Sequence, residues 1–244
     1  MRRRTAAFAA LLALAACSRV DPESGRSESA RGFPKADRPV SAPGANEFTA
    51  EDQRDNLGEA KVVMDLASIK QGTTVADIGA GEGYYTVRLA ERVGAKGRVL
   101  AQDIDPGAIQ RLGQRVERER LDNVSIKTGE PDNPRLPENS FDRIFLIHMY
   151  HEVSEPYAFL WHLRPALRAH GQVVVVDVDR STDQHGMPPA LLFCELSVVG
   201  FRLVEFVRKP ELKGYYAQFE AVGARPEAQQ IKPCSAAKGK TGTP

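Results

Sequence analysis

A glycine-rich stretch holds the residues whose types and spacing point most directly to chemistry. Gly79, Gly81 and Gly83 stand at every second position, Ala80 lies between the first two, and Asp77 precedes them in an apolar run. Glycine tolerates a positive φ and lets a ligand lie against the backbone. Because a helix is predicted to begin directly after this loop, we expect free backbone N–H groups there to hold the polar end of a nucleotide-like ligand.

The spacing of these glycines distinguishes between two kinds of ligand. A dinucleotide fingerprint needs a small residue where this sequence has Tyr84, which disfavours a nicotinamide-dependent oxidoreductase. Alternating glycines after an acid instead resemble motif I of the class I S-adenosyl-L-methionine (SAM) methyltransferases. The resemblance implies SAM as the cofactor. It also implies cofactor contacts from the residues of this stretch, Asp77, Gly79, Ala80, Gly81 and Gly83.

Two further segments supply carboxylates. Asp103 ends the predicted strand 98–103, where it can accept hydrogen bonds from both ribose hydroxyls, and Ile104 beside it can pack on adenine. Asp105 fits better as the N-cap of the next helix. In the family that the sequence resembles, an acid after the third strand accepts from the adenine amino group. Glu130 matches that position best, Asp132 competes with it, and either could equally be a solvated turn residue.

Two histidines are the acid/base candidates. Segment 139–148 resembles the Asn-Ser-Phe-Asp lead-in to the fourth strand of the superfamily, and His148 and His151 follow at its end, which faces the methyl donor in that fold. His148 could equally be structural, whereas for His151 we favour a role in the pocket. The His-x-x-His-Glu pattern differs from the zinc motif His-Glu-x-x-His and straddles a strand end, so we predict no metal ligands.

Strand and helix patterns alternate along the chain. The predicted strands are 74–78, 98–103, 124–128, 141–148, 172–178, 202–206 and 215–221. The predicted helices are 51–69, 84–93, 106–118, 155–167 and 188–199. This alternation predicts an α/β, doubly wound, Rossmann-like sheet with its ligand at the carboxyl ends of the strands. The resemblance implies seven strands in the order 3-2-1-4-5-7-6, with strand 7 antiparallel.

The ends of the chain differ from the middle. Residues 1–17 have the charge, apolar run and small residues of a signal peptide, and Leu14–Cys17 resembles a bacterial lipobox. We therefore expect a lipid anchor at Cys17 and a place in the cell envelope, on the periplasmic side of the outer membrane, with a cytoplasmic product as the alternative. Residues 18–47 are predicted to be a flexible linker, 48–222 the methyltransferase domain, and 223–244 a disordered tail.

Charge and cysteine content exclude little. Without Arg2–Arg4 the chain has 33 − 3 = 30 basic residues against 32 acidic ones, and no basic run marks a nucleic-acid surface. Cys194 and Cys234 could pair in an oxidising compartment. Because the tail looks mobile, we expect no structural disulfide.

The predicted function is a SAM-dependent methyltransferase that acts on a small molecule, similar to the ubiquinone/menaquinone C-methyltransferases. The expected acceptor pocket contains Arg54, Asn56, Leu57, Tyr84, Tyr85 and segment 181–192. SAM is made in the cytoplasm, which conflicts with export. The alternative is therefore a non-catalytic module that binds SAM or a nucleoside in the envelope. The acceptor and the oligomeric state do not follow from the sequence.

Overall fold

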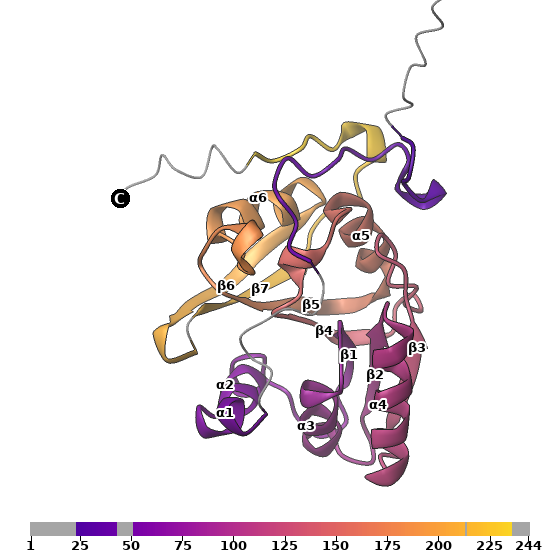
Figure 1. Ribbon diagram of the computed structural model, residues 1–244, viewed down its shortest axis with the longest axis vertical. Helices are drawn as coiled ribbons and strands as arrows, with labels where there is room; N and C mark the ends of the chain where they lie inside the picture. The colour runs from indigo at the N-terminus through magenta and orange to yellow at the C-terminus, as the bar shows by residue number, and fades with distance from the viewer. Residues whose placement is uncertain (1–22, 43–50, 213, 236–244) are drawn as a thin grey trace, which may run out of the picture.

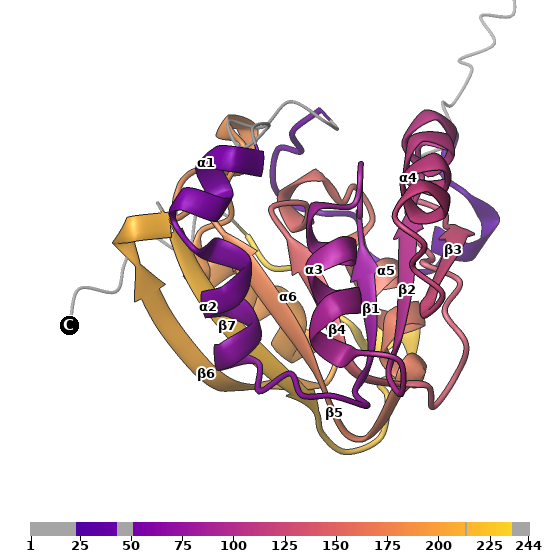
Figure 2. The same cartoon turned by 90° about the horizontal axis from the view of Figure 1, so that it is seen from below.

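A seven-stranded mixed sheet forms the centre of the protein (Figures 1 and 2). The computed structural model describes residues 23–42, 51–212 and 214–235, so the predicted signal peptide and its Cys17 lie outside the described residues. The strands are β1 (Thr74–Ile78), β2 (Arg98–Asp103), β3 (Val124–Thr128), β4 (Phe141–Ile147), β5 (Leu167–Asp177), β6 (Phe201–Lys209) and β7 (Gly214–Ala221). Their order is β3-β2-β1-β4-β5-β7-β6, and β7 runs antiparallel to both of its neighbours. The predicted fold class and strand order are confirmed.

Helices cover both faces of the sheet. They are α1 (Glu51–Asn56), α2 (Glu59–Leu66), α3 (Tyr84–Val93), α4 (Pro106–Arg118), α5 (Pro156–Leu163) and α6 (Pro189–Val198). Short 3-10 turns lie at η1 (Glu28–Ala30), η2 (Tyr150–Glu152), η3 (Arg164–Ala166), η4 (Thr182–Gln184), η5 (Pro210–Leu212) and η6 (Ala228–Gln230). Figure 1 shows α5 and α6 on one side of the sheet and α1 to α4 on the other.

Side chains alternate between the two faces of the sheet along each strand, so each strand contributes residues to two separate cores. On β1, Ala76 and Ile78 pack with α5 and α6, whereas Val75 packs with α2 and α3. Val173–Val176 on β5 divides in the same way between the two faces. A strand that is covered on both faces reads as a continuous apolar run, which explains the Val-Val-Val-Val sequence.

A few element boundaries differ from the prediction. The helix expected over 51–69 is interrupted at Gly58, whose φ of 64° separates α1 from α2. β4 ends at Ile147 because His148 adopts a left-handed φ of 53°. β5 begins earlier than expected, at Leu167, which pairs with Phe141 across the sheet.

Both terminal segments pack on the domain, contrary to the predicted linker and tail. Segment 23–42 (indigo) and the C-terminal segment 222–235 (yellow) lie side by side on the α5 and α6 face, joined by a bridge between Asp37 and Ser235 (Figure 1). Ala30, Phe33 and Ile231 are buried in the core on that face. These segments lack periodicity because they contribute single side chains rather than a helix or strand face.

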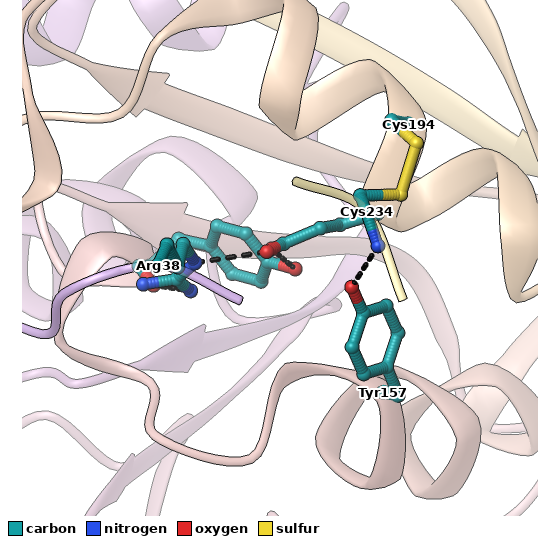
Figure 3. Close-up of a disulfide and its surroundings, with 6 residues drawn as sticks. Arg38, Tyr157, Cys194 and Cys234 are labelled. Atoms are coloured by element: carbon teal, nitrogen blue, oxygen red, sulfur yellow. Dashed lines mark hydrogen bonds and ion pairs between the residues drawn. A yellow bond between two sulfur atoms is a disulfide. The ribbon is translucent and has the colours of Figure 1, made fainter. Parts of the chain in front are cut away.

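A disulfide joins the C-terminal segment to α6, which corrects the expectation of free thiols. Cys194 and Cys234 are bonded, with their Cα atoms 6.0 Å apart (Figure 3). The N–H of Cys234 also donates a hydrogen bond to the Tyr157 hydroxyl at 2.6 Å. Cys234 is therefore fixed and buried, although the sequence around it carries no packing signal.

Within the described ranges, no helix has both the length and the apolar character needed to cross a bilayer.

Candidate functional site

A cavity of about 590 Å³ opens at the carboxyl ends of β1, β2 and β4. Seven of the predicted site residues line it, namely Gly79, Ala80, Gly81, Asp103, Ile104, Glu130 and His148. The volume lies in the range of small-ligand sites, and the place is where doubly wound folds bind their ligands. The other four, Asp77, Gly83, Asp132 and His151, are not among the lining residues.

The glycine loop connects β1 to α3 through left-handed backbone. Gly79, Gly81 and Gly83 have φ values of 68°, 56° and 90°. A Cβ at Gly83 would stand 2.5 Å from Leu112 Cδ1, so this glycine permits α3 and α4 to pack closely. The expected free N–H groups are largely used by the protein itself. Ala80 donates to the Gln102 carbonyl, Gly83 to the Ala80 carbonyl, and Gly81 to a carboxylate.

Asp77 lies beneath the loop instead of facing the cavity. It is 3% exposed and accepts a hydrogen bond from the Thr86 hydroxyl at 2.6 Å. Burial raises the pKa of Asp77 to about 6, while the hydrogen bond from Thr86 opposes the rise. The Asp77 carboxyl group therefore joins the end of β1 to the first turn of α3 and positions the loop between them.

Asp103 occupies the position that was predicted for a ribose acceptor. One carboxylate oxygen accepts from the Gly81 N–H at 2.8 Å and the other from the Asp105 N–H at 2.9 Å. Each oxygen retains a lone pair for a ligand hydroxyl. Ile104 beside it is 42% exposed on the cavity wall. Asp105 caps α4 by accepting from two N–H groups, as predicted.

The two acids after β3 have different surroundings in the structure. Glu130 lines the cavity and pairs with Arg135. Asp132 is 1% exposed and accepts from the Ser29 hydroxyl, so its side chain fixes the N-terminal segment. Between these two residues, only Glu130 is placed to contact a ligand in the cavity.

His148, and not the favoured His151, is the histidine that faces the cavity. His148 lines the cavity, and its Nε2 lies 3.4 Å from Glu59 Oε1. Glu59 is fully buried, pairs with Arg54 at 2.7 Å and accepts from the Tyr85 hydroxyl. Burial opposes ionisation of Glu59, but the hydrogen bonds of its partners, His148 and Arg54, outweigh burial and lower its pKa to about 2.

His151 lies behind the cavity wall. Its side chain is 1% exposed, and its Nδ1 stands 3.0 Å from both carboxylate oxygens of Asp177 at the end of β5. The pocket role that we expected for His151 therefore does not match its position.

The remaining wall differs in part from the expected acceptor pocket. Arg54 and Tyr84 line the cavity, with the Arg54 guanidinium 3.8 Å from the centre of the Tyr84 ring. Asn56, Leu57, Tyr85 and segment 181–192 are not among the lining residues. Sequence reasoning missed the wall after β4, which is formed by Met149, Glu152, Val153, Ser154 and Phe159. The signal was available, because this segment directly follows the strand end that was expected to face the methyl donor.

A family model described as a methyltransferase domain matches residues 69–197, more than half of the chain. The chain belongs to this methyltransferase domain family. The family and the fold imply SAM as the cofactor.

Several methyltransferases are similar to this chain in sequence, with identities below 30%. The chain is 28% identical over 114 residues to a protein-L-isoaspartate O-methyltransferase of Methanothrix thermoacetophila, and the matched region covers 47% of this chain and 51% of that protein. It is 25% identical over 120 residues to a demethylmenaquinone methyltransferase of Listeria monocytogenes, with coverage of 49% and 51%. It is 23% identical over 176 residues to a ubiquinone/menaquinone biosynthesis C-methyltransferase of Methylococcus capsulatus, with coverage of 70% and 68%. The chain thus spans about half the length of the first two.

Solved structures show the same fold. A SAM-dependent methyltransferase from Aquifex aeolicus superposes with a TM-score of 0.65 and 26% identity, over 70% of this chain and 93% of the other. The [4+2]-cyclase SpnF superposes with a TM-score of 0.59 and 16% identity, over 80% and 92%. SpnF is named as a cyclase, so similarity in this fold does not by itself identify the reaction.

The cavity of this methyltransferase domain suits an adenosyl group. Asp103 offers carboxylate oxygens for a ribose diol, and the exposed Ile104 offers an apolar contact for a flat base. Glu130 adds an acceptor at the cavity edge. No Cβ stands between the loop and the cavity at Gly81, where an added Cβ would meet no atom within 4 Å.

Proposed function

We propose that this protein is a SAM-dependent methyltransferase that acts on a small molecule. The observation that carries the proposal is the cavity at the ends of β1, β2 and β4, where Asp103, Ile104 and the glycine loop converge in a methyltransferase domain. SAM supplies an activated methyl group on its sulfonium when it is bound. The protein's main contribution is to align donor and acceptor in a pocket that excludes water.

The cofactor residues that we propose act by holding and orienting. Asp103 binds the ribose hydroxyls, Ile104 packs on the adenine, and Glu130 accepts from the adenine amino group. Gly79, Ala80 and Gly81 form the cavity wall against which the ligand lies, and the missing Cβ of Gly81 lets the ligand approach the backbone. Asp77 and Gly83 do not line the cavity and instead position the glycine loop. Asp77 joins β1 to α3, and Gly83 lets α3 approach α4.

Where the methyl acceptor must lose a proton, His148 is the base that the geometry favours. It lies on the cavity wall, and the carboxylate of Glu59 beside it remains ionised because its pKa is about 2. A carboxylate next to an imidazole orients the ring and stabilises its protonated form. Glu59 is a positioning residue in this scheme, because it acts through His148.

The acceptor that we propose is a small molecule with an apolar body. Tyr84, Met149, Val153 and Phe159 give the cavity wall an apolar part, and Arg54 adds a positive charge. Two of the relatives above are named for quinone methylation, which makes phenols and quinones the first acceptors to test.

The disulfide supports a location outside the cytoplasm. Structural disulfides persist mainly in oxidising compartments, and Cys194–Cys234 fastens the C-terminal segment to α6. We therefore propose the cell envelope as the location, in keeping with the lipobox-like segment that ends at Cys17. Export of the folded protein with its donor already bound would reconcile this location with the cytoplasmic origin of SAM.

Calorimetric titration of the protein with SAM and, separately, with NAD tests the cofactor site. We expect SAM to bind and NAD not to bind. Asp103→Asn, which keeps the shape of the side chain, should weaken SAM binding by roughly tenfold or more, because it replaces a charged acceptor by a neutral one. Asp122→Asn, the same substitution at an exposed position next to β3, is the matched control and should bind SAM as the wild type does.

Methyl transfer is then measured with isotopically labelled SAM and a panel of phenols and quinones. Labelled product supports the enzyme. SAM binding without transfer to any acceptor would favour a binding module instead. Equal SAM affinity in Asp103→Asn and the wild type would refute the assignment of the ribose site.

A further inference from the structure

Three potential metal-binding side chains meet at the cavity wall that follows β4. His151 and Glu152 come from η2, and His185 comes from the loop that follows η4. One ligand atom from each lies within 4.8 Å of the other two, and His151 Nε2 is 3.9 Å from Glu152 Oε1. The two imidazole rings stand edge to face, with centroids 5.6 Å apart.

Two ring nitrogens in this cluster are buried without a hydrogen bond. Among the described residues, neither His151 Nε2 nor His185 Nδ1 has a hydrogen-bond partner. A buried polar atom normally has a partner, and leaving one unsatisfied costs on the order of 1–3 kcal/mol. Two such nitrogens in one cluster of potential ligands indicate that the cluster can take up a ligand.

Asp177 prepares His151 to bind a cation. The Asp177 carboxylate, fully buried, holds His151 Nδ1 at 3.0 Å from both of its oxygens. A carboxylate next to Nδ1 favours the tautomer that carries its proton there, which leaves the Nε2 lone pair for a metal. A carboxylate behind a histidine is the usual support of a metal-ligating imidazole.

The loop that carries His185 is held in an unusual conformation. His185 has a left-handed φ of 53°, which a non-glycine residue rarely adopts. Its N–H donates to the Ser41 hydroxyl at 3.1 Å, and its carbonyl accepts from Arg180 at 3.3 Å. These bonds fix the imidazole next to His151 at the expense of local backbone strain.

We propose that His151, Glu152 and His185 form a binding site for a divalent transition-metal ion such as Zn²⁺. Two imidazoles and one carboxylate suit ions of intermediate softness and disfavour Mg²⁺ and Ca²⁺, which prefer oxygen ligands. Ligands about 2.1 Å from a tetrahedral ion stand about 3.4 Å apart, so side-chain movements on the order of 1 Å complete the site. Three protein ligands leave a coordination position open, as in catalytic zinc sites.

The site adjoins the proposed cofactor cavity. Glu152 belongs to the cluster and also lines the cavity, so an ion here lies at the cavity's edge. On the basis of the proposed function, the ion would polarise an oxygen of the bound acceptor. Metal binding itself requires neither SAM nor methyl transfer, so it can be tested separately.

The test is a titration of the untagged, chelator-treated full-length protein with ZnCl₂ in the absence of SAM, followed by calorimetry. The Cys17→Ser background removes the one cysteine outside the disulfide. Absorption of Co²⁺ in the visible region reports the coordination geometry independently. We expect one ion per chain, and a loss of affinity of at least about tenfold in both His185→Gln and Glu152→Gln.

His170→Gln, at an exposed position on β5, is the matched control and should bind Zn²⁺ as the background does. The Tm of each variant, measured without metal, identifies any that fails to fold. If one ligand variant fails to fold, the Zn²⁺ affinity of the other still tests the proposal. Absence of saturable Zn²⁺ binding, or equal binding by His185→Gln, Glu152→Gln and His170→Gln, would overturn the proposal and leave the His151–Asp177 pair as a purely structural contact.

Discussion

Asp77 gives a prediction whose magnitude follows from the structure. The carboxyl group is 3% exposed, and burial raises its pKa from the ordinary value of 3.8 to about 6. The folded protein therefore holds a proton on Asp77 that the unfolded chain has released between about pH 4 and pH 6. In this range the unfolded state binds fewer protons, so the contribution of Asp77 to stability falls as the pH rises.

Asp77→Asn removes this dependence. Asparagine resembles the protonated acid, and its carbonyl oxygen can still accept the hydrogen bond from Thr86. The difference between a pKa of 3.8 and one of about 6 corresponds to about 3 kcal/mol. The variant should therefore gain up to about 3 kcal/mol relative to the wild type between pH 4 and pH 7, with the gain levelling off above pH 6.

Urea unfolding of both proteins at several pH values between 3.5 and about 7.5, without SAM, measures the two free energies of unfolding. Asp105→Asn serves as a control of opposite sign. Asp105 is exposed, and hydrogen bonds from the Gly107 and Ala108 N–H groups lower its pKa from the ordinary value of 3.8. That variant should therefore lose stability relative to the wild type as the pH rises to about 5, and the difference should stay constant above that pH. A difference between Asp77→Asn and the wild type that does not change with pH would refute the reasoning.

Two further predictions concern the packed terminal segments. Replacing both Cys194 and Cys234 by serine opens a loop with a sequence separation of 40 and should lower the free energy of unfolding in urea by about 4 kcal/mol under oxidising conditions. Arg38→Met leaves the fully buried Glu195 without its cation and should cost about 3–5 kcal/mol in the same assay, whereas Lys61→Met, which breaks an exposed pair, should cost less than about 1 kcal/mol. Similar losses for the two variants Arg38→Met and Lys61→Met would contradict the assignment of a buried pair.

Regular elements could be predicted from the sequence because their signals are local. β1, α3, β2 and α4 have the predicted bounds, since apolar runs, glycines and a Pro at the start of α4 mark them directly. Asp103 and the glycine loop lie where the motif placed them for the same reason. Strand ends fix the position of such residues once the sheet order is known.

The rest depends on contacts between segments far apart in the sequence. His185 reaches His151 only because two loops meet beyond the ends of β4 and β5. Asp132 turns inward because Ser29 lies in front of it, and Phe33 is buried by α5, although neither segment has a periodic pattern. A single buried residue in an irregular segment leaves no periodic trace in the sequence.

The N-terminal segment, expected to be a tether, instead braces the candidate site. The Arg38 guanidinium donates to the carbonyls of Tyr150, His151 and Val153, and thereby satisfies backbone acceptors of η2 and of the residue that follows it. Arg38 also pairs with Glu195 of α6, whose other carboxylate oxygen accepts from the Tyr150 hydroxyl. A short 3-10 turn has few hydrogen bonds of its own, so it needs such external support to keep a fixed geometry.

The same segment also holds the second half of the proposed metal site. The Ser41 hydroxyl donates to the Thr182 carbonyl and accepts from the His185 N–H. Arg38 and Ser41 are three residues apart, so one short stretch of chain ties η2 to the loop that carries His185. The wall of the cavity after β4 and the cluster behind it thus owe their geometry to a segment outside the sheet and its helices.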